Sequence, residues 1–348
     1  MGPLTLRAEI QQWPLVRPFK ITGHTFETVE LLLITLNTGE HEGRGEAAGV
    51  YYLGESATSM VERIVPLRGV IENGIDRESL QELLPACGAR NALDCALWDL
   101  ESKVTGHSAW RATGLERPGR LLTTFTCGAE APEVMAATAR AYKGARAIKL
   151  KLTGDPVDKE RVRAVRDSLP DVWLGVDANQ GFSRPFLERL MPVLMDARIQ
   201  LIEQPFKMGQ EALLDGFQSP IPLAADESAQ SLSDIPGLVG RFNVVNIKLD
   251  KCGGLTAGLA MARSAKRLGL SVMVGNMIGT SLAMAPAFVL GQLCDIVDLD
   301  GPVFLKDDRP WGVTYADGFV TCPEVLWGCP VGNVVVSLES AQERVPRF

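Results

Sequence analysis

The stretch Ala147-Ile-Lys-Leu-Lys-Leu152 alternates apolar and basic residues, and this alternation decides the fold. Successive side chains of a β-strand point to opposite faces, so Lys149 and Lys151 share one face and the apolar residues share the other. The apolar face suits packing against a layer of helices. The two lysines then point the other way, into the mouth of a closed sheet. The stretch therefore predicts a buried strand with one polar face.

Seven further stretches of the same kind flank this strand. The eight expected strands are Thr123–Cys127, Ala147–Leu152, Trp173–Asp177, Gln200–Glu203, Pro222–Asp226, Val244–Lys248, Ser271–Gly275 and Ile296–Asp300. Segments with helical periodicity, such as Arg184–Met195 and Ala257–Leu268, lie between them. This alternation predicts a TIM-type (β/α) barrel in the α/β class. A six-stranded dinucleotide-binding sheet is disfavoured, because no Gly-x-Gly-x-x-Gly motif follows a first strand.

The segments on either side of the barrel have a different texture. Residues 1–50 are strand-like, and residues 55–115 are helical, with apolar residues of Ala89–Gly106 recurring at helical spacing. The tail after residue 304 contains Pro, Gly and strand-like pieces without a further βα unit. We therefore expect an N-terminal α+β capping domain at 1–117, the barrel at 118–304, and a C-terminal segment at 305–348 that packs back on the capping domain.

Composition restricts the partners and the compartment. The 348 residues carry 35 Lys plus Arg and 42 Asp plus Glu, a formal net charge of −7, which disfavours nucleic acid as a partner. No apolar run approaches the ~20 residues that span a bilayer, and the start lacks the features of a secretory signal. The seven cysteines are scattered without a Cys-x-x-Cys pair, as expected of free thiols. We expect a cytoplasmic protein with small-molecule partners and no membrane association, and a homo-oligomer stays open.

Acidic residues terminate three consecutive expected strands: Asp177, Glu203 and Asp226. The carboxyl ends of the strands form the active-site face of a (β/α) barrel, and neighbouring strands lie about 5 Å apart. Three ionised carboxylates that converge there repel one another unless a cation joins them. Only three histidines are present, and oxygen ligands with open positions suit Mg²⁺. The sequence therefore predicts a magnesium site.

Lysines approach this site from both sides, Lys149 and Lys151 from the strand before it and Lys248 from the strand after it. A metal that binds a carboxylate stabilises the charge formed when the neighbouring carbon loses a proton. A lysine in a cationic pocket has a lowered pKa and can act as the base. Two lysines on opposite faces can invert a stereocentre. We interpret Asp250 and Lys251 as structural turn residues.

These residues resemble the enolase superfamily, in its muconate-lactonising subgroup. The similarity covers essentially the whole chain, and RNALDCALWDL at 90–100 resembles a capping-domain helix of that family. NIKLDKCGGL at 246–255 and DLDGP at 298–302 are more specific and resemble the dipeptide epimerases, of the L-Ala-D/L-Glu epimerase type. The resemblance implies an isomerase with Mg²⁺ as its cofactor. Such an enzyme inverts the α-carbon of the C-terminal residue of a dipeptide through an enediolate, and peptidoglycan peptide metabolism is the implied source of the dipeptide.

The resemblance also implies roles for individual residues. Lys151 and Lys248 correspond to the two acid–base groups, and Lys149 to a partner of the substrate carboxylate. The implied Mg²⁺ ligands are Asp177, Glu203 and Asp226. The acidic pair of Asp298 and Asp300 corresponds to the site of the substrate's free ammonium group. Thr126 and Asn276 match substrate-contacting positions.

One loop departs from the family pattern. Members that act on a C-terminal glutamate carry an arginine shortly after a Pro-Phe pair, and here that position falls on Gly23 or His24 of the loop Pro18–Thr25. Either His24 or Lys20 substitutes for it, or the C-terminal residue is not acidic. The alternatives on this scaffold are an o-succinylbenzoate synthase, an N-succinylamino acid racemase and a cycloisomerase. Asp298 and Asp300 disfavour them, because their substrates carry no free ammonium there. A non-catalytic binding protein is disfavoured because none of the lysines or carboxylates is missing.

Overall fold

The computed structural model describes residues 2–330, and its N-terminal part is a three-stranded antiparallel sheet covered by helices. The strands are β1 (Thr5–Ile21), β2 (His24–Thr38) and β3 (His41–Ala48), in that order. The helices are α1 (Ala57–Ile64), α2 (Arg68–Glu72), α3 (Arg77–Leu83), α4 (Gly88–Thr105) and α5 (Ala109–Ala112). Helix α4 lies directly on β3, because a Cβ atom on Gly45 would be 2.1 Å from the carbonyl oxygen of Ala92. This close approach buries α4 along most of its length.

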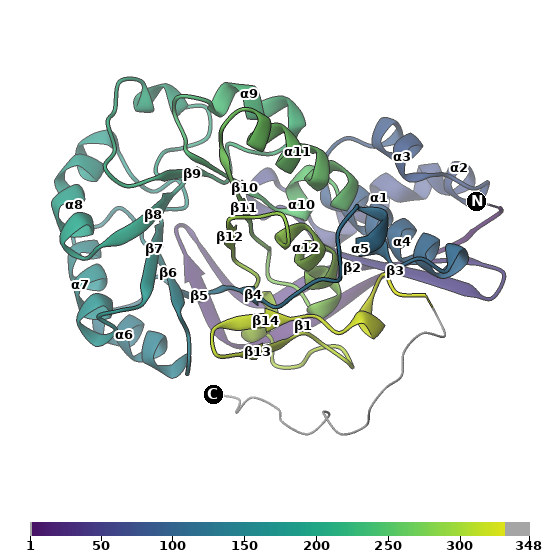
Figure 1. Ribbon diagram of the computed structural model, residues 1–348, viewed down its shortest axis with the longest axis horizontal. Helices are drawn as coiled ribbons and strands as arrows, with labels where there is room; N and C mark the ends of the chain where they lie inside the picture. Colours follow the sequence, from purple (N-terminus) through teal and green to yellow (C-terminus); the bar gives the residue numbers. More distant parts are fainter. Residues whose placement is uncertain (1, 331–348) are drawn as a thin grey trace.

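The eight expected barrel strands form one parallel sheet in sequence order. They are β5 (Thr124–Cys127), β6 (Ala147–Lys151), β7 (Trp173–Asp177), β8 (Ile199–Glu203), β9 (Leu223–Ala225), β10 (Val244–Ile247), β11 (Ser271–Val274) and β12 (Ile296–Val297). The helices between them are α6 (Pro132–Ala141), α7 (Asp158–Ser168), α8 (Arg184–Asp196), α9 (Ile235–Leu238), α10 (Leu249–Cys252), α11 (Leu255–Arg267) and α12 (Ser281–Gly291). Figure 1 shows α6, α7 and α8 outside the curved sheet. The prediction of a (β/α) barrel with an N-terminal α+β capping domain is confirmed.

The last barrel strand is shorter than expected. Of the predicted strand Ile296–Asp300, only Ile296 and Val297 form β12, and side chains connect the end of this strand to β5. The amide of Leu299 donates to Thr123 Oγ1 (2.9 Å), and the amide of Thr126 donates to Asp300 Oδ2 (2.7 Å). The Asp300 carboxylate thus takes a main-chain donor of β5 that a longer partner strand would use. This exchange places both acidic residues of the pair at the mouth.

Residues 305–330 contact both parts of the molecule. Strands β13 (Thr314–Ala316) and β14 (Phe319–Thr321) form an antiparallel sheet with β4 (Leu121–Leu122), before the first barrel strand. Farther on, Trp327 Nε1 donates to the carbonyl oxygens of Arg44 and Cys95, both at 3.1 Å. These contacts support our proposed division into 1–117, 118–304 and 305–348, of which residues 331–348 lie outside the described part. Within residues 2–330 there is no helix long and apolar enough to cross a membrane.

Arg90 of α4 joins the capping helices to the barrel. Its guanidinium group donates to the carbonyl oxygens of Leu84 (2.9 Å), Cys252 (2.6 Å) and Gly253 (3.2 Å). The side chain is buried, and a Cβ atom on Gly253 would lie 2.3 Å from Arg90 Nε. Arg90 therefore fixes the cap above the loop that follows β10.

We predict that Arg90→Met lowers the free energy of unfolding by about 2–4 kcal/mol, because it leaves several buried carbonyl groups without donors. Urea unfolding followed by circular dichroism measures this change. Arg63→Met, at an exposed position of α1, is the matched control and should change stability by no more than ~0.5 kcal/mol. Equal midpoints for the two variants would contradict the role of Arg90.

Candidate active site

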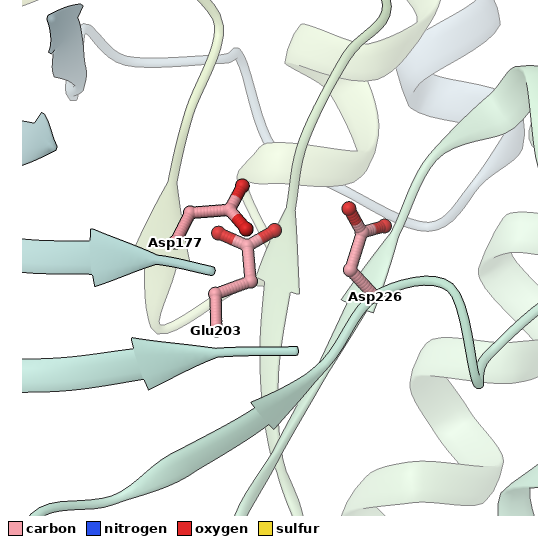
Figure 2. Close-up of side chains that lie close together, drawn as sticks. All are labelled: Asp177, Glu203 and Asp226. Atoms are coloured by element: carbon pink, nitrogen blue, oxygen red, sulfur yellow. The ribbon is translucent and has the colours of Figure 1, made fainter. Parts of the chain in front are cut away.

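Three carboxylates converge at the carboxyl ends of β7, β8 and β9. Asp177 pairs with Glu203 in the parallel register, and Glu203 pairs with Ala224, two residues before Asp226. One carboxylate oxygen from each residue lies within 4.8 Å of the others, and each side chain is at most 1% exposed. Figure 2 shows the three groups turned toward a common space. Oxygen donors in a buried, anionic pocket fit Mg²⁺, and these three residues are the ones that would hold it. We call them the acidic triad.

The predicted lysines lie on both sides of the acidic triad. Lys151 Nζ is 2.6 Å from Asp177 Oδ2, and Lys248 Nζ is 2.7 Å from Asp226 Oδ2. Lys149 Nζ is 3.4 Å from Glu203 Oε2 and forms a second, closer ion pair with Asp298. All three lysines are buried. Strand β6 therefore supplies lysines from one flank and the end of β10 supplies a lysine from the other, as the sequence indicated.

The pKa values of Lys149 and Lys248 are raised, whereas the sequence led us to expect a lowered value. Burial lowers the pKa of Lys248, but the charges of Asp226 and Glu203 outweigh it and leave the pKa well above its ordinary value. The same balance raises the pKa of Lys149, with Asp298 as the largest opposing charge. Burial, together with the charge of Asp177, raises the pKa of Glu203 to about 7. The charges of the neighbouring carboxylates outweigh burial for both Lys149 and Lys248, which explains the difference.

Lys251 is a residue of the site that sequence reasoning missed. Its side chain is buried in α10, and its Nζ donates to Asp226 Oδ1 (2.6 Å) and to the carbonyl oxygen of Asn246 (3.1 Å). Asp250, in contrast, is structural as expected: it accepts from the amide of Ala48 (2.9 Å) in the capping sheet. The signal for Lys251 in the sequence was its position three residues after Lys248. One turn of α10 brings its side chain to Asp226, the carboxylate that also pairs with Lys248.

The acidic pair lies on the opposite side of the mouth. Asp298 accepts from Thr124 Oγ1 and from Lys149, whereas Asp300 accepts from the amide of Thr126. Burial and the charge of Asp298 raise the pKa of Asp300 to about 6. Asn276 Nδ2 donates to the carbonyl oxygen of Asp298 (2.5 Å). The structure thus brings Thr126 and Asn276 together with the acidic pair.

Aromatic side chains of the capping domain cover the rim. Thr22 Oγ1, at the β1–β2 turn, donates to the carbonyl oxygens of Leu152 (2.9 Å) and Ala178 (3.1 Å) and holds the turn on the barrel. The exposed ring of His24 stacks on Tyr51 with 5.0 Å between centroids. Burial and the charge of Glu227 raise the pKa of Tyr51. His24 is therefore a solvent-exposed residue in contact with Tyr51.

Six buried carboxylates and four buried lysines line this mouth. The carboxylates are Asp177, Glu203, Asp226, Glu227, Asp298 and Asp300, and the lysines are Lys149, Lys151, Lys248 and Lys251. With all ten groups ionised, the set would carry an excess of two negative charges, which a divalent cation would offset. Glu227 is the second residue that sequence reasoning missed, although it directly follows Asp226 at the strand end.

Two protein-family models match the chain. "Mandelate racemase / muconate lactonizing enzyme, N-terminal domain" matches residues 4–114, and "Enolase C-terminal domain-like" matches residues 133–328. An L-Ala-D/L-Glu epimerase of Escherichia coli (strain K12) is 37% identical over 316 residues, 90% of this chain and 98% of the relative. An N-acetyl-D-glutamate racemase of Pseudoalteromonas sp. is 36% identical over 304 residues, 86% of this chain and 95% of the relative.

Solved structures agree with these matches. An enolase family member from Agrobacterium tumefaciens with homology to dipeptide epimerases, bound to sodium and L-Ala-L-Glu, has a TM-score of 0.91 at 37% identity, covering 94% of this chain and 100% of that chain. A dipeptide epimerase from Methylococcus capsulatus, complexed with Mg and the dipeptide L-Arg-D-Lys, has a TM-score of 0.86 at 30% identity, covering 93% and 98%. The chain therefore belongs to the enolase superfamily, in the branch that contains mandelate racemase and muconate-lactonizing enzyme.

Proposed function

We propose that the protein is a Mg²⁺-dependent dipeptide epimerase that inverts the α-carbon of the C-terminal residue. The observation that carries this proposal is the acidic triad with one lysine on each flank, Lys151 at Asp177 and Lys248 at Asp226. Asp177, Glu203 and Asp226 hold the metal. The names of the Escherichia coli and Methylococcus capsulatus relatives support the same reaction.

The lysines perform the proton transfer in this proposal. Bound Mg²⁺ supplies stabilisation of the negative charge that develops on the substrate carboxylate as the α-proton leaves. Lys151 removes the α-proton from one face, and Lys248 returns a proton to the other face, or the reverse for the opposite enantiomer. Lys149, fixed between Glu203 and Asp298, keeps a positive charge beside the substrate carboxylate.

The acidic pair selects a free ammonium group in this proposal. Asp298 is already paired with Lys149, whereas Asp300 accepts a hydrogen bond from the amide of Thr126. Asp300 is therefore the stronger of the two acceptors for a substrate ammonium, with Thr126 and Asn276 fixing the pair. The rings of His24 and Tyr51, which both contact Phe26, border the space for the C-terminal side chain in this proposal. The free thiols of all seven cysteines support a reducing compartment such as the cytoplasm.

A second candidate function is the racemisation of an N-acylamino acid, because the Pseudoalteromonas relative carries that name. Its substrate has the same α-proton and carboxylate but lacks the free ammonium group. The requirement for that ammonium separates the two functions. Within the first function, peptides released from peptidoglycan are a suitable source of dipeptides.

We predict that Lys151→Ala and Lys248→Ala each lower epimerisation by at least about 10²-fold, because each removes the acid–base group of one face. In D₂O, at least one variant should still exchange the α-proton of one enantiomer without inverting it. Mass spectrometry and chiral chromatography of an incubated dipeptide library measure both quantities. Epimerisation that persists in either variant would exclude the two-base mechanism.

We predict that Asp300→Asn lowers kcat/KM for L-Ala-L-Glu by roughly 30- to 1,000-fold, because a buried ammonium then lacks its partner. For N-acetyl-L-glutamate, which has no ammonium group, the same variant should change kcat/KM by less than about 3-fold. A wild-type enzyme that turns over only the N-acetyl compound would instead establish the second candidate function.

We predict that chelation with EDTA abolishes α-proton exchange and that Mg²⁺ restores it. Mg²⁺ at 100 times its Kd should also stabilise the folded protein by about 2.7 kcal/mol, measured as a rise in the thermal unfolding midpoint. Glu203→Gln removes one ligand of the acidic triad and should eliminate this Mg²⁺-dependent rise. Exchange at the full rate in EDTA would rule out a metal-dependent reaction.

A further inference from the structure

Four buried side-chain oxygen atoms near the acidic triad have no hydrogen-bond partner within residues 2–330. They are Asn179 Oδ1, Glu227 Oε2, Gln230 Oε1 and Asn246 Oδ1. Most buried polar atoms in proteins are hydrogen-bonded, so each exception needs an explanation. All four atoms are acceptors, and two of their residues bond the triad directly. The amide of Asn179 donates to Asp177 Oδ1 (2.8 Å), and Asn246 Nδ2 donates to Glu203 Oε1 (2.6 Å). Residues 2–330 therefore supply no donor to these four oxygens.

Glu227 has the most unusual position of the four. Its side chain is 1% exposed, and its Oε1 accepts only a long hydrogen bond from Asn179 Nδ2 (3.5 Å). Burial, followed by the charges of Asp226 and Asp177, raises the pKa of Glu227 to about 8. Its other oxygen, Oε2, is buried and has no hydrogen-bond partner within residues 2–330. A buried carboxylate in this position is costly unless a ligand compensates it.

The surrounding loop holds Glu227 in place. Gln230 Nε2 donates to the carbonyl oxygen of Glu227 (2.7 Å) and to the hydroxyl of Tyr52 (3.0 Å), which joins this loop to the capping domain. Glu227 is not one of the groups whose oxygens lie within 4.8 Å of one another. The geometry thus gives it a fixed position next to the metal ligands but outside their set.

We propose that Glu227, together with Asn179, accepts hydrogen bonds from water molecules carried by the Mg²⁺ and thereby strengthens metal binding. This inference rests on the magnesium site of the proposed function and adds two positioning residues to it. Mg²⁺ loses its water reluctantly and is usually held by a few carboxylates with several waters retained. Those waters donate hydrogen bonds through their O–H groups, and Glu227 Oε2 and Asn179 Oδ1 are acceptors without a donor. Residues that hold such outer contacts typically change metal affinity 10- to 100-fold when mutated.

The test is a calorimetric titration of the metal-free, full-length protein with MgCl₂ in the absence of substrate. We expect Glu227→Gln to raise the Kd for Mg²⁺ by about 10- to 100-fold. Asp300→Asn is the matched control, because it removes the same charge from the same mouth on the far side, beside Thr126. It should change the Kd by less than about 3-fold. Equal weakening in both variants, or an unchanged Kd in Glu227→Gln, would overturn the proposal.

A second readout separates this role from a structural one. Glu227→Gln relieves repulsion with Asp226 and Asp177, so the unfolding midpoint of the metal-free protein should stay equal or rise. A lower midpoint without metal would assign Glu227 a structural role and overturn the proposal. Should Glu227→Gln fail to fold, Asn179→Gly provides the test, since glycine tolerates the φ of +40° at this position and no charge changes. Asn179→Gly should raise the Kd for Mg²⁺ severalfold. An unchanged Kd would contradict the proposed role of Asn179 and Glu227 as hydrogen-bond acceptors.

The two proposals fail in different ways. A protein that binds Mg²⁺ with the expected variant effects but exchanges no α-proton in D₂O would contradict the proposed reaction and leave the role of Glu227 intact. If the protein epimerises dipeptides but Glu227→Gln binds Mg²⁺ normally, the proposed reaction stands and the proposed role of Glu227 is contradicted.

Discussion

The mutual repulsion of three buried carboxylates is the constraint on which the rest of the mouth depends. Parallel strands lie about 5 Å apart, so acidic residues at the adjacent carboxyl ends of β7, β8 and β9 cannot move far from one another. Their register is fixed by the sheet: Lys151 pairs with Asp177, and Asp177 pairs with Glu203. Because the strand geometry holds the three carboxylates close together, nearby positive charges are needed to offset their repulsion. The four buried lysines supply such charges, and the predicted cation would supply the rest.

The placement of these lysines explains why two residues of one strand have different roles. Lys149 lies earlier in β6 and is held between two carboxylates, Glu203 and Asp298. Lys151, at the end of the strand, has a single close partner, Asp177. A cation that takes over Asp177 would release Lys151, whereas Lys149 would keep Asp298. The lysine with one partner is therefore suited to proton transfer, and the lysine with two is suited to a fixed charge.

The alternation in Ala147–Leu152 predicted a strand with one polar face, because strand side chains repeat with a period of two residues. The barrel was predicted from eight such strands with helical segments between them. The acidic triad followed from the same rule, since strand ends are visible as the last apolar residue. Lys251 and Glu227 were not predicted, because both lie just beyond strand ends, where the chain turns and no periodicity fixes a direction. The short length of β12 could not be predicted for a related reason. Asp300 accepts a hydrogen bond from the main chain of Thr126, and this contact between distant parts of the sequence forms only when the barrel closes.

The residues proposed for proton transfer and those proposed to contact the substrate side chain lie on different parts of the fold. The lysines and carboxylates sit on or next to short, buried strands, whose positions the sheet fixes. His24 and Tyr51 sit on a turn and on a short segment of the capping domain, which the barrel holds through a few contacts such as those of Thr22 and Tyr52. A change of residue in these cap segments alters the rim without disturbing the triad. In the proposed reaction, the absence of an arginine from Pro18–Thr25 therefore bears on the preference for a substrate side chain and not on the roles proposed for Lys151 and Lys248.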